Sequence, residues 1–226
     1  MPEFDHAELA DEYDTYAEKK EEILDNLKRL VIESNESLEG NAFCLDASLN
    51  LYPRLFTKQV NLFWSGKQAI TRICEIGFNA GHSTMLLLLG RETSPAEFTI
   101  FDIGTHRYTR PCVSYVQSAF PHVKFEYIEG DSTVTMRPWI DAHKDLIAAY
   151  DVVHVDGGHS EHCITNDMKH ADMLVKPYGI VIIDDTDINN PHINGCVDSY
   201  ISSGRYVELD IIKTQCYPHR ILRKIL

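Results

Sequence analysis

The sequence contains no long apolar run. Its longest apolar stretch, residues 85–89, is far shorter than the roughly 20 residues that a membrane-spanning helix requires. Residues 1–20 are rich in Asp and Glu and contain no apolar signal region. These two absences predict a protein with neither a membrane segment nor a targeting sequence.

Basic residues are also few. The chain has 21 Lys and Arg against 34 Asp and Glu, a net charge of −13, and its Lys and Arg form no cluster longer than a pair. A surface that binds the phosphates of a nucleic acid needs such clusters, so we do not expect the substrate to be a nucleic acid. The six cysteines lack Cys-x-x-Cys spacing, and Cys74 and Cys196 have apolar neighbours, as expected for reduced thiols in a cytoplasmic protein.

The N-terminal part of the chain is predicted to be helical. Residues 7–37 are charged but place Ile23, Leu27 and Val31 at helical spacing, which gives one narrow apolar face. A second helix is predicted over residues 51–66. We therefore divide the chain into a helical extension, residues 1–66, acting as a lid or a homo-oligomer contact, and one domain, residues 67–226.

The remainder alternates between strands and helices. The predicted strands cover residues 72–76, 97–101, 124–128, 150–155, 180–183, 206–212 and 220–225. Helical stretches separate the first five, which predicts a parallel sheet with helices on both faces. The last two are too close for a crossover helix and predict a hairpin. The predicted fold is an α/β sheet of seven strands, mostly parallel, with the last strand antiparallel.

Residues 72–81 carry the most informative motif. An apolar strand ends at Glu75 and Ile76 and opens into a turn containing Gly77 and Gly81, followed by a helix start. Glycines let the backbone approach a ligand, and the free amide groups of a helix start attract one. The turn lacks the Gly-x-Gly-x-x-Gly pattern of dinucleotide-binding folds. It predicts a site for a nucleoside-bearing cofactor, although a turn that only connects strand to helix would also contain glycines.

Acidic residues follow every strand of the parallel set. Ligands of such sheets bind at the carboxyl ends of the strands, where this chain places Glu75, Asp102, Asp131, Asp156 and the pair Asp184-Asp185. Asp102 lies 21 residues beyond Gly81, near the spacing at which an acidic residue accepts hydrogen bonds from the cofactor ribose. After Asp102, His106 and Tyr108 could flank the adenosine half of the cofactor, although a solvated loop is the simpler interpretation.

The ends of the fourth and fifth strands predict catalytic chemistry. Asp156, Asp184 and Asp185 can converge on a hard divalent cation such as Mg²⁺. The cation would lower the pKa of a substrate hydroxyl, and His159, three residues beyond Asp156, could accept the proton. The intervening Gly157-Gly158 would also suit a purely structural loop.

Together, these motifs resemble class I S-adenosylmethionine (SAM) dependent methyltransferases, especially the metal-dependent macrocin-type sugar O-methyltransferases and the related methyltransferase-domain family. The resemblance covers residues 71–226. The usual first motif is Glu-x-Gly-x-Gly-x-Gly, so Asn79 replaces its middle glycine, and Asn tolerates positive φ better than most residues. The resemblance implies an adenine contact at Asp131 and Ser132, where Asp131 would equally serve as a helix N-cap. It also implies metal ligands and a general base at the residues proposed above.

The sequence thus predicts a SAM-dependent methyltransferase that modifies a hydroxyl of a small molecule such as a sugar, polyol or catechol-like diol, assisted by Mg²⁺ or a similar cation. Two alternatives remain open. One is an NAD-dependent oxidoreductase, against which the missing dinucleotide pattern counts. The other is a non-catalytic member of the fold that uses its N-terminal helices to bind a partner, against which the intact carboxylates count.

Overall fold

A seven-stranded sheet runs through the residues described by the computed structural model, 6–39, 42, 52–91, 94–209 and 218–225. Its strand order is β3-β2-β1-β4-β5-β7-β6. The first five strands are parallel, and β7 is antiparallel to both of its neighbours. This confirms the predicted fold class. The strands are β1 (Arg72–Ile76), β2 (Ala96–Asp102), β3 (Val123–Glu129), β4 (Tyr150–Val155), β5 (Val175–Ile183), β6 (Tyr206–Glu208) and β7 (Arg220–Lys224).

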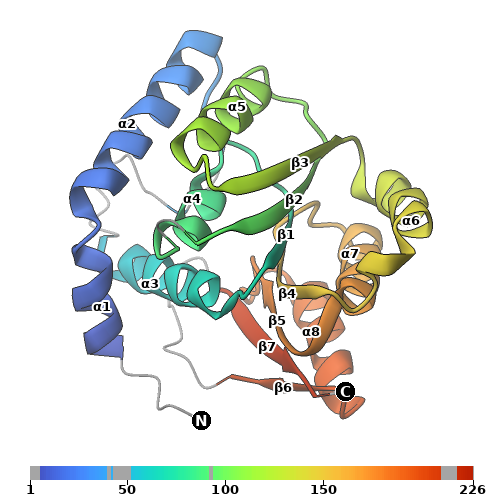
Figure 1. Cartoon of the computed structure of the whole chain (residues 1–226). Coiled ribbons are helices and arrows are strands. Elements are labelled where there is room, and N and C mark those ends of the chain that lie inside the picture. The colour runs from blue at the N-terminus through green and yellow to red at the C-terminus, as the bar shows by residue number, and fades with distance from the viewer. Residues whose placement is uncertain (1–5, 40–41, 43–51, 92–93, 210–217, 226) are drawn as a thin grey trace.

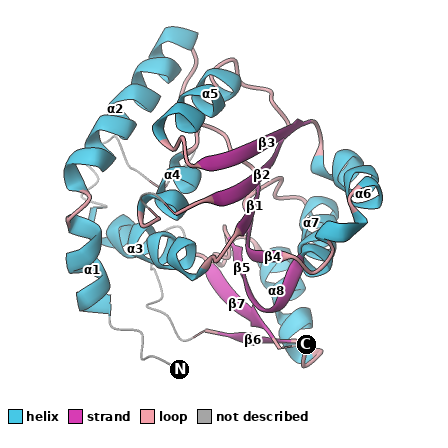
Figure 2. Cartoon of the chain, viewed as in Figure 1, coloured by secondary structure: helices cyan, strands magenta, loops and turns pink. Residues whose placement is uncertain are grey.

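Helices cover both faces of the sheet (Figures 1 and 2). The first five helices lie on one side of the sheet, with the first two packed on the outside of the next three, and the last three helices lie on the other side. Each side has its own cluster of buried side chains. The helices are α1 (His6–Asp14), α2 (Ala17–Ser34), α3 (Tyr52–Gln68), α4 (His82–Leu89), α5 (Thr109–Ala119), α6 (Ser132–Ala142), α7 (Glu161–Leu174) and α8 (Pro191–Ser202).

Three predicted elements differ from the structure. The strand predicted over residues 180–183 begins earlier, at Val175. The single helix predicted over residues 7–37 is broken near Thr15, whose hydroxyl donates to the carbonyl of Glu12 at 2.6 Å. Such a side-chain bond competes with the helical ladder. The strand predicted over residues 206–212 ends at Glu208, and residues 210–212 lie outside the described part of the chain.

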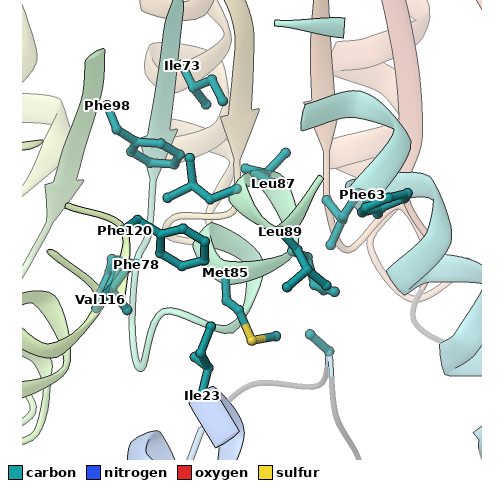
Figure 3. Packing of buried hydrophobic residues seen from close by; sticks show 14 of the residues in the cluster. Ile23, Phe63, Ile73, Phe78, Met85, Leu87, Leu89, Phe98, Val116 and Phe120 are labelled. Atoms are coloured by element: carbon teal, nitrogen blue, oxygen red, sulfur yellow. The ribbon is translucent and has the colours of Figure 1, made fainter. Parts of the chain in front are cut away.

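Helix α4 is buried on all sides. Residues 85–89 have no exposed surface, because the sheet covers one side of the helix and α3 covers another (Figure 3). Gly66 of α3 makes this approach possible, since a Cβ at Gly66 would lie 1.8 Å from the carbonyl oxygen of Leu87. Helix α3 is thus part of the main core, and it continues past residue 66. The predicted division of the chain into residues 1–66 and 67–226 stays a prediction.

Two further predictions concern the surroundings of the protein. Within the described ranges, no helix combines the length and apolar character needed to cross a membrane. Cys74, Cys112, Cys163 and Cys196 are free thiols, while Cys44 and Cys216 lie outside those ranges. The cytoplasmic location stays a prediction.

Candidate functional site

The loop between β1 and α4 has the backbone conformation that a cofactor loop needs. Gly77, Asn79 and Gly81 have φ values of 92°, 53° and 84°, so Asn79 adopts the left-handed conformation in place of the usual glycine. A Cβ at Gly77 would lie 1.9 Å from the carbonyl oxygen of Asp156, which leaves no room for a side chain. Gly81 provides no side-chain cap for α4, so the first amide groups of the helix stay available to a ligand.

Asp102 at the end of β2 holds this loop in place. One carboxylate oxygen accepts hydrogen bonds from the amides of Phe78 and Asn79, each at 2.8 Å, and the other accepts from the amide of Gly104 at 2.7 Å. A carboxylate offers about four acceptor positions, so three amides leave capacity for one more donor. The contact of Asp102 with a ribose stays a prediction, alongside this structural role.

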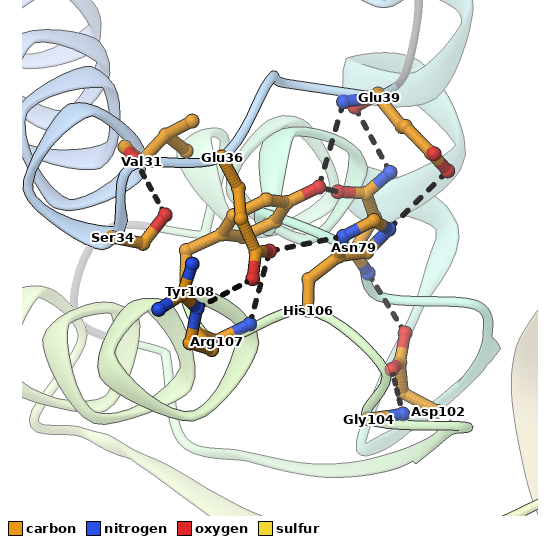
Figure 4. Close-up of polar contacts among 10 residues, drawn as sticks. All are labelled: Val31, Ser34, Glu36, Glu39, Asn79, Asp102, Gly104, His106, Arg107 and Tyr108. Atoms are coloured by element: carbon orange, nitrogen blue, oxygen red, sulfur yellow. Dashed lines mark hydrogen bonds and ion pairs between the residues drawn. The ribbon is translucent and has the colours of Figure 1, made fainter.

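The side chain of Asn79 links the loop to the segment after α2 (Figure 4). Its amide nitrogen donates to the carbonyl of Glu39 at 2.9 Å, and its oxygen accepts from the hydroxyl of Tyr108 at 2.7 Å. The His106 ring stacks on Tyr108 and pairs with Glu36 and Glu39, each at 3.2 Å. Tyr108 is fully buried, so it does not belong to a solvated loop. An asparagine at a position usually held by glycine predicts the backbone conformation there but does not identify the partners of its side chain. The contacts of Asn79 with Glu39 and Tyr108 were therefore not predicted from the sequence.

A cavity of about 760 Å³ opens beside the loop, at the carboxyl ends of the parallel strands. This volume is typical of small-molecule sites. Asp131 at its edge caps α6, because its carboxylate accepts from the amide of Thr133 at 2.9 Å; this confirms the N-cap interpretation. The predicted site residues that line the cavity are Gly77, Asn79, Asp102, Asp131, Ser132, Asp156, His159 and Asp185.

Glu75 is not among the lining residues and lies in a buried layer below the cavity. One of its oxygens pairs with Nδ1 of His154 at 3.0 Å, and the other accepts from the hydroxyl of Thr84. Burial lowers the pKa of His154, but the hydrogen bond to Glu75 and the negative charges of Glu75, Asp156 and Asp184 together outweigh burial and raise that pKa overall. A direct contact between Glu75 and the cofactor stays a prediction.

Asp184 also lies in this buried layer, paired with a residue that the sequence reasoning missed. The ammonium of Lys58 in α3 lies 2.8 and 2.6 Å from the two carboxylate oxygens of Asp184, and both side chains are at most 3% exposed. Burial raises the pKa of Asp184, but the charge and hydrogen bond of Lys58, together with the nearby histidines His154 and His219, outweigh burial and hold that pKa below its ordinary value. Lys58 shares a helical face with Leu55 and Leu62. A lysine on an apolar helical face was the sequence signal that could have identified Lys58 as a buried, paired residue.

The three predicted metal ligands do not form one set. Ligand atoms within 4.8 Å of one another occur in two groups among the described residues: His154, Asp156 and Asp184, and Asp156, His159 and Asp185. The first group does not fit a cation, because Lys58 contacts both oxygens of Asp184. The second lines the cavity, and its two carboxylates fit a Mg²⁺ ion, which usually binds one or two carboxylates and retains water.

His159 and Asp185 are in direct contact. Nε2 of His159 lies 2.7 Å from Oδ2 of Asp185, and the side chains are 59% and 15% exposed. This hydrogen bond raises the pKa of His159, against a smaller effect of burial. By contrast, burial and the nearby charge of Asp184 raise the pKa of Asp156 well above its ordinary value. The predicted base and two of the three predicted metal ligands, Asp156 and Asp185, therefore line the same cavity.

Known proteins share this arrangement of elements. A proposed O-methyltransferase from Klebsiella pneumoniae has a TM-score of 0.59 at 13% identity, covering 92% of this chain and 89% of that chain. The O-methyltransferase from Bacillus cereus in complex with SAH has a TM-score of 0.56 at 14% identity, covering 92% and 91%. The CurJ carbon methyltransferase has a TM-score of 0.53 at 14% identity, covering 97% and 69%. At these identities the likeness shows the fold.

The family follows from the sequence itself. No curated protein matches the chain significantly. The family model described as "Methyltransferase domain" matches residues 74–186, half of the chain, from β1 to the segment after β5. The matched segment includes the loop between β1 and α4, Asp102, Asp156 and His159. The chain therefore belongs to the methyltransferase-domain family and is a class I SAM-dependent methyltransferase.

Proposed function

We propose that this methyltransferase transfers the methyl group to a hydroxyl oxygen of a small molecule, with His159 as the general base. The observation that carries the proposal is the contact between His159 and Asp185 at 2.7 Å, in the same cavity as the loop of Gly77 and Asn79. An imidazole oriented by a carboxylate is suited to accept a proton from a hydroxyl. The resulting oxygen nucleophile would attack the methyl carbon of SAM, the carbon–sulfur bond would break, and S-adenosylhomocysteine would leave as a neutral thioether.

The two ends of the cavity suit different parts of the reaction. The loop and Asp102 would hold the ribose of SAM, and Asp131 and Ser132 would contact the adenine. The acceptor would then lie at the end with Asp156, His159 and Asp185. Because methyl transfer needs oxygen, carbon and sulfur in line, much of the rate would come from holding cofactor and acceptor in one cavity.

A divalent cation would be held by the carboxylates of Asp156 and Asp185. Such a cation lowers the pKa of a bound hydroxyl and orients it, which favours acceptors with two adjacent oxygens, such as sugars, polyols and catechols. Within this proposal His159 does not bind the cation and accepts the proton instead. Asp184 also takes no part in binding the cation.

The experiment begins with titration calorimetry of the purified protein against SAM, SAH and NAD. Binding of SAM and SAH is expected; binding of NAD alone would contradict the proposal. Labelled SAM is then incubated with a panel of sugars, polyols and catechols, with and without Mg²⁺, and the methylated atom is identified by mass spectrometry and NMR. Methylation at carbon, as the CurJ carbon methyltransferase would suggest, would overturn the assignment to oxygen.

The base is tested by His159→Gln, which is expected to reduce kcat at least about 100-fold, the usual contribution of a general base, while SAH affinity changes little. His162→Gln is a matched control, since His162 is exposed on α7 and does not line the cavity. Equal activity of the two variants would exclude His159 as the base.

A further inference from the structure

We propose that Lys58 is a positioning residue for the acceptor end of the site: its ammonium takes the place of a metal ion on Asp184 and, through Asp184 and Asp185, orients His159. The proposal rests on the function proposed above. Lys58 belongs to α3, outside residues 74–186 matched by the family model. The N-terminal part of the chain would thus contribute to the active site through the pair of Lys58 and Asp184.

The pair of Lys58 and Asp184 lies deep in the protein. Lys58 is 1% exposed, and its ammonium contacts both oxygens of Asp184 within 2.8 Å. Buried ion pairs contribute little net stability, because desolvation offsets most of their attraction. Stability alone is therefore a weak reason for this pair, whereas the same ammonium leaves no room for a divalent cation on Asp184.

His219 lies near the pair of Lys58 and Asp184, and the charges of both affect its pKa. Asn61, one turn further along α3, pairs with Nε2 of His219 at 3.1 Å. Burial, together with the charge of Lys58, lowers the pKa of His219 to about 3. His219 is therefore neutral and does not compete with Lys58 for Asp184.

A chain of contacts leads from Lys58 to the base. The oxygen Oδ1 of Asp184 accepts from Lys58 and also from the backbone amide of Asp185 at 2.8 Å. Asp185 has a φ of 54°, a left-handed conformation that a non-glycine residue keeps only when its surroundings enforce it. From this conformation its carboxylate reaches Nε2 of His159. Loss of the ammonium would release Asp184, then the backbone of Asp185, and then the imidazole.

The test uses Lys58→Met, which keeps the length of the side chain without its charge, in the full-length protein. We expect kcat with an acceptor from the panel of sugars, polyols and catechols described above to fall at least tenfold, while the Kd for SAH stays within twofold. The matched control is Lys67→Met on the same helix, where Lys67 pairs with Glu12 at the surface. This control should keep the wild-type kcat.

A second variant separates positioning from folding. Lys58→Met leaves a buried carboxylate unpaired and lowers stability, whereas Lys58→Met/Asp184→Asn removes both charges and should recover most of the melting temperature. If Lys58 positions the base, the double variant stays slow. ¹⁵N-histidine NMR spectra report on the bond between Nε2 of His159 and Asp185. In both variants that carry Lys58→Met, the Nε2 resonance should lose the chemical-shift change that this bond causes. In the control Lys67→Met, the resonance should stay as in the wild-type protein.

A folded double variant with wild-type kcat and an unchanged His159 resonance would overturn the role of Lys58. Failure of the wild-type protein to bind SAH would instead overturn the proposed function. The NMR measurement needs neither cofactor nor acceptor, so the two failures are distinguishable.

Discussion

Nε2 of His159 lies 2.7 Å from Oδ2 of Asp185, although the two residues follow different strands, β4 and β5. The hydrogen bond raises the pKa of His159, and a general base works only in its neutral form. The rate of methyl transfer should therefore rise with pH through a midpoint above about 6.5, the ordinary pKa of histidine. The pH profile of kcat measures this midpoint.

Asp185→Asn removes the negative charge from this pair. The pKa of His159 should fall, and the midpoint of the pH profile should move to lower pH, with a lower maximal rate because the imidazole is held less firmly. Asp187→Asn, two residues along the loop and outside the cavity lining, removes a charge that raises the pKa of His159 less than Asp185 does, so it should move the midpoint less. A midpoint that stays in place in Asp185→Asn would contradict the assigned base.

Replacement of Gly77 by alanine should damage the fold. The added Cβ would lie 1.9 Å from the carbonyl oxygen of Asp156, at a φ of +92°. We expect a loss of roughly 3 kcal/mol or more in the free energy of unfolding, measured by urea denaturation. Gly195→Ala is the control, because nothing lies within 4 Å of that position in α8; it should gain about 0.5–1 kcal/mol.

Asn79 can be tested by two substitutions that separate its backbone from its side chain. Asn79→Gly removes the hydrogen bonds to Glu39 and Tyr108 but accepts the left-handed conformation. Asn79→Ala removes the same bonds and adds strain of about 1 kcal/mol. Both should bind SAH several-fold more weakly, and the alanine variant should also melt at a lower temperature. Wild-type affinity in Asn79→Gly would show that the link to Glu39 does not affect the cofactor site.

The burial of Asp167 should make the stability of the protein depend on pH. This carboxyl is fully buried in α7, and burial raises its pKa from 3.8 to about 6. Because the folded state binds the proton more tightly, this group lowers stability as the pH rises from about 4 to 6, with the full penalty above that range. Asp167→Asn should therefore stabilise the protein by about 1–3 kcal/mol at pH 7, and the gain should disappear below about pH 4. Urea denaturation at both pH values measures it; an equal gain at both would contradict the raised pKa.

The sheet was predictable from sequence because most of its parallel strands are short apolar runs followed by acidic residues, and helical stretches separate them. The positive φ of Asn79 followed from its place in a glycine-bearing motif. The partners of individual side chains could not be predicted from the sequence. Lys58 lies 126 positions before Asp184, and no local sequence pattern connects the two residues. For the same reason the sequence suggested three equivalent metal ligands, whereas Asp184 is paired with a lysine and Asp156 and Asp185 face the cavity.

The close packing of Gly77 against the carbonyl of Asp156 joins the segment that would receive the methyl donor to the segment that would receive its target. With no side chain between them, a displacement of one backbone carries the other along. Changes of substrate preference during evolution would then arise in peripheral loops, because a mutation at this junction would disturb both reactants at once.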